Sequence, residues 1–493
     1  MLRCFSPRTV FAGALYLAAA TGGTSLAADP PTWPQFRGTN SSGVAEGDRP
    51  LPVEFGPSKN CLWKTALSVG HSSPCICGDR IFLTGYDQAT SKLETFCISR
   101  DDGAILWRQT APAEKIEKSH ELGNPASSTT AVDAERVHVY FGSYGLLCYD
   151  HAGNEQWKLP LKTPQARFGT ATSPVLVDGR LILNYQGGYA IAVDAKTGGE
   201  IWKNAKLPYP PDYALPVVRK IGDVSEVIIQ GTGGMAAVDL KDGALRWQVS
   251  GFAMMPIGTP VLGEDLLFAV SFHPIGKSED RITVTWAELL AKYDENGDKK
   301  LGEKELPEKL ALVSRGDPEG AGDMTFKQMF GMLDRNNDKK IDALEWTGVE
   351  MFTGQINNAL MAFRSGEDGK ISKQGMVWKA ERGLPESPSP LYYRGNLYLV
   401  KNGGVLSCFE AATGKQHYQQ RIEAPGSYYA SPVAGDGKIF TSSMDGIVTV
   451  LEAGDKLNVL ARNNLKERLM ATPAIADGKL YIRTAGHLYA FGM

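Results

Sequence analysis

The chain has 493 residues, of which 43 % are hydrophobic and 22 % are charged, a composition typical of a soluble globular protein. Its 54 glycines and 28 prolines favour a turn-rich, all-β chain, and the length allows one large domain and one small one. The net charge of −3 argues against a surface for nucleic acid or anionic membrane, since both need clustered Lys and Arg.

The first 27 residues predict a signal peptide. A basic segment with Arg3 and Arg8 precedes an apolar stretch over residues 9–20, and Ser25-Leu26-Ala27 fits a cleavage site. The apolar stretch is short for a membrane span, and no later stretch approaches spanning length. We therefore expect an exported protein, periplasmic or secreted, with an N-terminal extension over residues 28–60 and no transmembrane segment after removal of the signal.

A repeat of about 40–45 residues, the length of a propeller blade, occupies residues 61–273 and 358–493. Its clearest copies, residues 192–202 and 237–247, each contain a Thr-Gly or Asp-Gly turn and end in Trp. Most copies open with a Ser-Pro or Thr-Pro pair. The alternating apolar residues that follow suit half-buried strands, and the recurrent Trp would pack between neighbouring blades.

Eight repeat units can be counted, and they begin near residues 71, 124, 169, 213, 257, 388, 430 and 471. The last unit has no Trp strand of its own, and Trp63 can supply one, which would close the ring and remove its open sheet edge. We predict an all-β, eight-bladed β-propeller of four-stranded antiparallel blades. Seven blades is the alternative, because the unit over residues 430–465 is degenerate.

The cysteines allow two interpretations. Export permits disulfides, but several cysteines occupy equivalent repeat positions where other repeats carry Ala or Val, which favours small buried strand residues. The cysteines that follow the signal segment are Cys61, Cys75, Cys77, Cys97, Cys148 and Cys408.

The repeated pattern Asp-x-x-Thr/Asp-Gly-x-x-x-Trp resembles the PQQ-like (quinoprotein-type) β-propeller family, over nearly all of residues 60–493 outside one insert. Quinoprotein dehydrogenases of that family resemble one another in an adjacent Cys pair above the quinone, a Trp platform, an Asp base and a catalytic calcium. This chain has only Cys75-x-Cys77, and the repeat accounts for its tryptophans, so we do not expect PQQ. Other members resemble the outer-membrane assembly factor propeller, which presents a rim to partner proteins and usually carries a lipid-attachment cysteine that is missing here.

An insert over residues 274–357 interrupts one blade, because Trp247 and Trp378 lie about three times farther apart than neighbouring repeat tryptophans. The apolar period changes there from 2 to 3.6, which predicts helices. Two sets of four apolar residues each fit one helical face, namely Trp286, Leu289, Leu290 and Tyr293, then Phe326, Met329, Phe330 and Leu333.

Each predicted helix runs into an acidic loop, residues 294–305 and 334–345, that resembles the EF-hand calcium loop. Both loops have oxygen donors at positions 1, 3 and 5, an apolar residue at 8 and Glu at 12. The apolar residues, Leu301 and Ile341, would pair the loops through a short β-bridge. The expected ligands of the two Ca²⁺ sites are Asp294, Asn296, Asp298, the carbonyl of Lys300 and Glu305, then Asp334, Asn336, Asp338, the carbonyl of Lys340, Asp342 and Glu345.

Position 6 of each loop, which normally carries Gly because the backbone turns sharply, is Lys299 or Lys339. A non-Gly residue at positive φ costs on the order of 1 kcal/mol, and the lysine charge repels the ion. We therefore expect weak to moderate calcium affinity. The alternative is that these loops are acidic turns that bind no ion.

No catalytic motif is apparent, because the histidines are scattered and lack an H-E-x-x-H or G-x-S-x-G context. His71, in a loop before a strand, can face the central channel. We predict an exported calcium-binding propeller that is more a binding or scaffold protein than an enzyme, with a protein or cell-envelope partner on one rim. A PQQ-dependent dehydrogenase and an assembly-factor-like propeller are the alternatives.

Overall fold

The computed structural model describes Met1 and residues 33–166, 168–253, 256–272, 285–313, 324–334, 336–347 and 358–493. Residues 1–30 and 31–493 are separate units, and the first is described only at Met1. The predicted signal peptide and both ends of the predicted insert, 274–284 and 348–357, lie outside these ranges. None of the described helices is long and apolar enough to cross a membrane.

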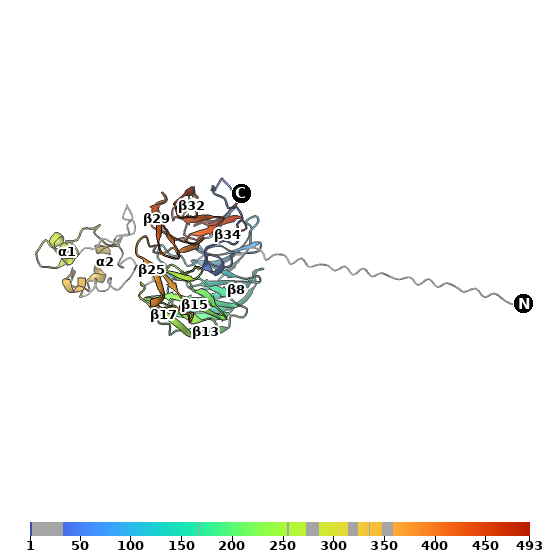
Figure 1. Cartoon of the computed structure of the whole chain (residues 1–493), viewed down its shortest axis with the longest axis horizontal. Helices are drawn as coiled ribbons and strands as arrows, with labels where there is room; N and C mark the ends of the chain where they lie inside the picture. The colour runs from blue at the N-terminus through green and yellow to red at the C-terminus, as the bar shows by residue number, and fades with distance from the viewer. Residues whose placement is uncertain are drawn as a thin grey trace. The chain divides into compact units, whose positions relative to one another are not determined.

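The second unit contains eight four-stranded antiparallel sheets arranged as the blades of a β-propeller (Figure 1). The first four blades are β2–β5 (Cys75–Cys77, Arg80–Asp87, Lys92–Ser99, Ile105–Thr110), β6–β9 (Ala131–Val132, Arg136–Phe141, Gly145–Asp150, Glu155–Pro160), β10–β13 (Val175–Val177, Arg180–Tyr185, Tyr189–Asp194, Glu200–Asn204) and β14–β17 (Val217–Ile221, Val224–Gly231, Gly234–Asp239, Leu245–Ser250).

The last four blades include the interrupted one and the one that closes the ring. They are β18, β19, β24 and β25 (Val261–Leu262, Leu266–Ser271, Ala359–Arg364, Met376–Ala380), β26–β29 (Leu391–Tyr393, Asn396–Lys401, Val405–Glu410, Gln416–Arg421), β30–β33 (Val433–Gly435, Lys438–Ser442, Ile447–Glu452, Val459–Asn464) and β34–β36 (Ala474–Ala476, Lys479–Arg483, His487–Phe491) with β1 (Cys61–Ala66).

The ring closes through the predicted strand around Trp63. β1 pairs antiparallel with β36, with Lys64 opposite Tyr489 and Ala66 opposite His487. The count of eight blades is confirmed, and the alternative of seven is wrong because the degenerate unit still forms the complete sheet β30–β33.

The repeat tryptophans pack between blades, as predicted. Trp157 donates its indole N–H to the carbonyl of Ala195 in the next blade at 3.0 Å, and Trp202 donates to that of Leu240 at 2.9 Å. The turn glycine of the next blade lies against the indole. At Gly198, the positive φ of +72° disfavours any residue with a Cβ, and a Cβ there would also come within 2.6 Å of the Trp157 ring. This turn therefore requires Gly for two separate reasons.

A belt of hydroxyls joins the blades around the central channel. The Ser or Thr that opens a repeat accepts a hydrogen bond from the backbone N–H of the equivalent residue in the preceding blade, as Ser431 does from Ser389 at 3.0 Å. Within the described residues, the backbone N–H of the first residue donates to the hydroxyl of the second in these pairs: Ser73 and Thr129, Thr129 and Ser173, Leu215 and Thr259, Thr259 and Ser389, Ser389 and Ser431, Ser431 and Thr472, and Thr472 and Ser73. The belt is interrupted after Ser173, because the fourth blade has Leu215 at this position.

The insert lies between β19 and β24 of the fifth blade. It contains α1 (Trp286–Tyr293) and α2 (Phe326–Leu333), each begun by a capping box, together with the strand pairs β20–β23 (Leu301–Gly302, Lys340–Ile341) and β21–β22 (Ala311–Val313, Met324–Thr325). Leu301 pairs with Ile341, as predicted. Short 3-10 turns occur at η1 (Thr39–Ser41) and η2 (Lys373–Gly375).

All six cysteines of the described residues are unpaired. Cys75, Cys97, Cys148 and Cys408 are fully buried in strands, and burial raises the pKa of these thiols to about 12. They are small core residues with little thiolate character, which agrees with the interpretation of these cysteines as small buried strand residues.

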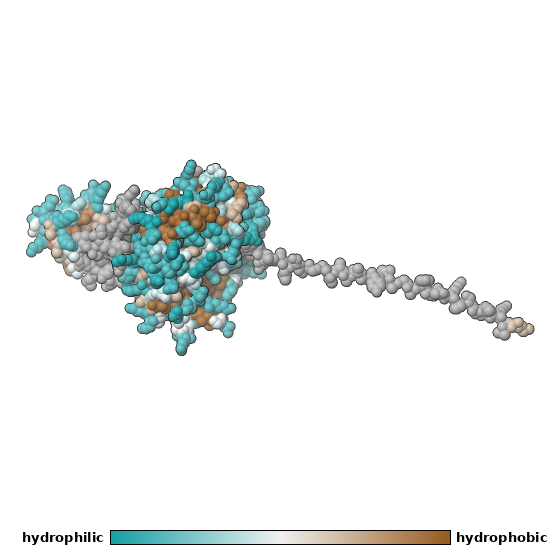
Figure 2. Space-filling model, turned by 45° about the horizontal axis from the view of Figure 1, so that its top comes forward, coloured by the Kyte–Doolittle hydropathy of each residue, from teal (hydrophilic) through white to brown (hydrophobic). Residues whose placement is uncertain are grey.

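Apolar side chains also reach the surface, where patches alternate with hydrophilic areas on the face shown in Figure 2. The most regular of these side chains precede the docking tryptophans on the outermost strands. They include Leu62, Leu106, Ile201 and Val377, which are between 39 % and 50 % exposed. Single exposed residues of this kind are normal on a soluble protein.

Candidate functional site

The first residue of each insert loop holds the turn that follows it. The carboxylate of Asp294 accepts a hydrogen bond from the N–H of Lys299 at 2.9 Å, and Asp334 accepts one from Lys339 at 2.9 Å. The two lysines have φ of 61° and 66°. The left-handed turn expected at position 6 is therefore present in both loops, despite the lysine side chains.

The last residue of each loop turns back toward position 3. Glu305 accepts a hydrogen bond from the side-chain amide of Asn296 at 2.7 Å. Glu345 accepts one from the backbone N–H of Asn336 at 3.2 Å and another from that of Asp342 at 3.0 Å. The predicted ligands at positions 3 and 12 thus lie together in each loop.

The two loops are joined by reciprocal ion pairs. Lys300 donates to the carboxylate of Asp338 at 2.8 Å, and Lys340 donates to that of Asp298. These lysine hydrogen bonds are the main reason that the pKa of each aspartate lies below its ordinary value. Sequence reasoning assigned only the backbone carbonyls of these lysines a role, and missed their amines.

The loop side chains face their own backbone and each other's lysines. Within the described ranges, no group of three or more His, Cys, Asp or Glu side chains is gathered tightly enough to hold a metal ion. The donors in each loop nevertheless have the chemistry that Ca²⁺ prefers, since they are short carboxylate and amide oxygens with one backbone carbonyl. Calcium would have to displace Lys300 and Lys340 from Asp338 and Asp298.

The N-terminal extension crosses the central channel of the propeller. It bonds to inner strands of the first, second and third blades through residues 33–35, and to the sixth and seventh blades through Arg37 and residues 43–45. Arg37 is fully buried and donates to the carbonyl of Pro390 at 2.7 Å, and its burial lowers its pKa to about 9. Blades on opposite sides of the ring are therefore linked by one segment, which no repeat or motif in the sequence indicates.

A cavity of about 110 Å³ remains in the channel beside the hydroxyl belt. Phe36 of the extension lines it together with His71, Tyr213 and Tyr429. Burial, with the nearby charges of Arg483 and Arg468, lowers the pKa of His71 to about 3, so its imidazole is neutral at physiological pH. The expectation that His71 faces the channel is confirmed.

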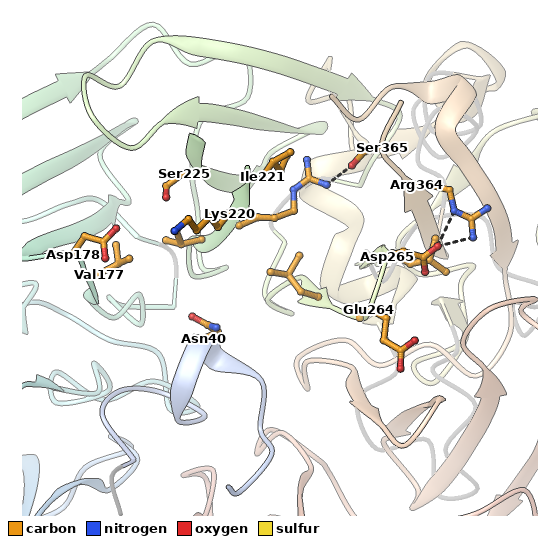
Figure 3. A pocket seen from close by; sticks show the side chains of 15 residues that line it. Asn40, Val177, Asp178, Lys220, Ile221, Ser225, Glu264, Asp265, Arg364 and Ser365 are labelled. Carbon is orange, nitrogen blue, oxygen red and sulfur yellow. Dashed lines mark hydrogen bonds and ion pairs between the residues drawn. The ribbon is translucent and has the colours of Figure 1, made fainter. Parts of the chain in front are cut away.

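A larger cavity, of about 590 Å³, lies where the third, fourth and fifth blades meet (Figure 3). Its apolar wall comes from the inner strands, and its rim carries charges of both signs. In Figure 3 the Lys220 side chain extends toward Asp178, while Arg364 bonds to Asp265 at 3.0 Å. The residues around it are Asn40, Val177, Asp178, Val218, Arg219, Lys220, Ile221, Ser225, Leu262, Gly263, Glu264, Asp265, Leu266, Arg364 and Ser365. Sequence reasoning missed this cavity entirely.

A family model described as outer membrane protein assembly factor BamB matches residues 56–212, 97–276 and 362–492. A curated relative, the quinohemoprotein alcohol dehydrogenase ADH-IIG of Pseudomonas putida, is 24 % identical over 155 residues. That match covers 29 % of this chain and 21 % of the relative, so it spans about a fifth of the dehydrogenase.

Two solved structures have the same fold. BamB from Moraxella catarrhalis superposes with a TM-score of 0.52 at 13 % identity, covering 87 % of this chain and 98 % of that one. A europium-containing methanol dehydrogenase superposes with a TM-score of 0.55 at 12 % identity, covering 94 % and 98 %. At such identities the likeness is one of fold alone.

Proposed function

We propose that this chain, which belongs to the family described as outer membrane protein assembly factor BamB, is an exported, non-catalytic binding propeller, and that its insert binds two calcium ions. The observation that carries the calcium proposal is the paired arrangement of the insert loops. Each loop has the EF-hand donor order, a left-handed residue at position 6, and a β-bridge to the other loop at position 8. A pair of unrelated acidic turns would have no reason to share all three features.

The residues that would hold calcium are the predicted ones. In the first loop they are Asp294, Asn296, Asp298, the carbonyl of Lys300 and Glu305, and in the second they are Asp334, Asn336, Asp338, the carbonyl of Lys340, Asp342 and Glu345. Calcium would supply charge neutralisation and a rigid link among these oxygens. Since Lys300 and Lys340 compete for two of the aspartates, we expect dissociation constants of about 10⁻⁴–10⁻³ M, as in extracellular modules.

Calorimetric titration of the full chain with CaCl₂ tests this part of the proposal. The wild type should bind two ions and melt at a higher temperature with calcium. Glu305→Gln combined with Glu345→Gln should remove both effects, because position 12 supplies two of the ligand oxygens. Glu303→Gln, an exposed carboxylate outside the ligand positions, is the matched control and should bind normally. Wild type without heat of binding and without a gain in melting temperature would contradict the proposal.

A PQQ-dependent dehydrogenase is the second candidate, and the match to ADH-IIG favours it. Against it stands the size of the channel cavity, about 110 Å³, because pockets that bury a molecule of cofactor size begin at about 300 Å³. Cys75 and Cys77 are also both unpaired. We therefore expect no turnover when PQQ, calcium, an alcohol and a dye acceptor are added; dye reduction that requires PQQ would reverse the order of the candidates.

Export is part of the proposal and rests on the signal-like first 27 residues. Fractionation of cells that express the full chain should recover it in the envelope or periplasm, and a variant without residues 1–27 should stay inside the cell. Recovery of both forms in the same compartment would contradict export by this segment.

A further inference from the structure

One position of the repeat turns its backbone toward the channel. In the first blade it is Ile76, whose N–H donates to the carbonyl of Trp33 at 2.9 Å and whose carbonyl accepts from the Trp33 N–H at 2.8 Å. In the seventh blade it is Ala434, whose N–H donates to Gly43 at 2.7 Å and whose carbonyl accepts from Ala45 at 2.8 Å. The extension is therefore an added strand segment at both places.

The second and third blades use the same position. Val132 donates its N–H to the carbonyl of Pro34 at 2.7 Å, and Leu176 donates to the side-chain oxygen of Gln35 at 3.1 Å. In each of these four blades, the residue that bonds to the extension follows the Ser or Thr of the hydroxyl belt by three positions, as Ile76 follows Ser73. The chain thus bonds to the inner edge of four of its own blades, by strand addition in the first and seventh and by single hydrogen bonds in the second and third.

Ladder geometry explains why this position is available. In antiparallel pairs, residues alternate between those that bond to their partner and those whose N–H and carbonyl point away from it. Leu176 lies opposite Leu181, one step before the tight turn pair Val177–Arg180. Its backbone N–H and carbonyl therefore point away from the neighbouring strand β11. Val218 opposite Val227 and Leu262 opposite Leu267 occupy the same ladder position in the fourth and fifth blades.

These two blades are the ones that the extension passes without bonding. Among the described residues, no hydrogen bond of the extension reaches β14 or β18. β14 is also longer than the other inner strands, so that Lys220, opposite Ser225, is a second residue whose backbone points away from the ladder. Val218 and Lys220 therefore present one continuous strand edge.

The large cavity lies along this edge. Four consecutive residues of β14, residues 218–221, line it. Side chains of consecutive strand residues point to opposite faces, so a cavity that touches all four extends around this end of β14, from its free edge to Ser225 of β15 and Arg364 of β24. A smaller cavity of about 90 Å³ shares Asn40, Val177 and Val218 with it and continues along β14 to Pro216. The groove is thus continuous with the interface that the extension already forms.

We propose that an extended peptide segment of a partner protein binds in this groove as an added strand, with backbone hydrogen bonds to Val218 and Lys220. The partner side chain beside Lys220 is acidic, because this exposed amine extends toward Asp178 at the rim of the cavity and forms no ion pair within the described part of the chain. The segment's apolar side chains face Val177 and Leu262. This inference rests on the binding role proposed above and is independent of calcium.

Fluorescence anisotropy with a labelled peptide pool tests the proposal on the full mature chain. The probe is a pool of seven-residue peptides in which Val alternates with Ser or Thr around a central Asp. In an extended peptide, the N–H groups of odd and even residues lie on opposite edges. N-methylation of the residues that face β14 should therefore abolish binding, while N-methylation of the residues that face away should leave it unchanged. Equal binding by both methylated pools, or no binding by the parent pool at 1 mM, would overturn strand addition.

Two variants locate the site. Val218→Pro removes an edge N–H that takes no part in the ladder, so the fold tolerates it and peptide affinity should fall at least tenfold. Lys220→Glu should weaken the Asp pool by about fivefold and favour a pool with central Lys. Lys206→Glu, an exposed lysine after β13, is the matched control. Variants that bind like the wild type would exclude this groove.

Titrations run in calcium and in EGTA separate this inference from the calcium proposal. Peptide binding should be equal in both. If the chain binds calcium but no peptide, the calcium proposal stands and peptide binding in the groove is refuted. If it binds peptide but no calcium, the groove proposal stands and calcium binding by the insert is refuted.

Discussion

Lys299 and Lys339 are residues whose local preference conflicts with the structure around them. Both have positive φ, and both donate their backbone N–H to the first aspartate of the loop at 2.9 Å. A Cβ at positive φ is strained, so each of these lysines weakens the folded insert.

Replacing both lysines with Gly should stabilise the insert by on the order of 1 kcal/mol per loop, because Gly adopts positive φ without the Cβ penalty. Hydrogen exchange of the α1 and α2 amides measures the local opening free energy. Lys304→Gly, at an exposed position without positive φ, should destabilise instead. A loss of protection in the Lys299→Gly, Lys339→Gly chain would contradict this account.

His71 makes stability depend on pH. Its folded pKa is about 3, against 6.5 for an ordinary histidine, because it is buried and lies near Arg483 and Arg468. As pH falls below 6.5 the unfolded chain takes up a proton that the folded chain refuses, so stability declines between about pH 6.5 and 3. Below that window both forms are protonated.

We expect His71→Gln to lose less stability than the wild type between pH 7 and pH 4, as measured by urea unfolding at each pH. His120→Gln, at an exposed histidine, should keep the dependence of the wild type. Parallel pH profiles for wild type and His71→Gln would show that His71 carries no such coupling.

At the scale of elements, blades are joined by two recurrent contacts rather than by one. The indoles of most docking tryptophans reach a carbonyl of the next blade on the outer side, as Trp378 does to Ala411 at 2.9 Å, whereas Trp247 donates to the Glu226 carboxylate of its own blade. The hydroxyl belt joins the same blades near the axis. The contacts lie at opposite ends of each interface, so together they fix the angle between neighbouring sheets.

Ser431→Ala should cost about 1–3 kcal/mol, because it leaves the buried N–H of Ser389 without its acceptor. Urea unfolding followed by tryptophan fluorescence measures the loss. Ser387→Ala is the matched control, since Ser387 lines the same channel cavity but takes no part in the belt. Equal losses in the two variants would mean that the belt bond contributes nothing particular.

For the whole molecule, closure depends on a strand that comes from the other end of the chain. β1 covers the edge of β36, and Trp63 docks on the first blade through the carbonyl of Arg100 at 3.0 Å. Without β1, the last blade would have three strands and an open edge. An open edge of this kind pairs readily with other chains.

Two truncations isolate this effect. A chain that starts at residue 61 keeps β1, while a chain that starts at residue 67 lacks it, and both lack the extension. We expect the shorter chain to melt at a lower temperature and to self-associate in sedimentation velocity runs, and the longer one to stay monomeric. Identical behaviour of the two truncations would refute closure by β1.

The sequence by itself determined the propeller, the closing strand and the place of the insert, and it favoured eight blades over seven. These features repeat or have a fixed period, so each is visible in a short window: a Trp about every 45 residues, a Ser-Pro or Thr-Pro pair before most first strands, and a helical period beside each acidic loop. The predicted pairing of Leu301 with Ile341 followed from the same regularity. The calcium ligands remain a prediction.

Only the tertiary structure decided where the non-repeating parts lie. The path of residues 33–60 across the channel, the reciprocal pairs of Lys300 and Lys340, and the open edge at Val218 and Lys220 each depend on residues brought together from distant or separate segments. Such contacts have no period in the sequence. Which segments make these contacts depends on how much of each inner strand the closed ring leaves exposed. That exposure is fixed only once all the blades are assembled, so no single segment determines it.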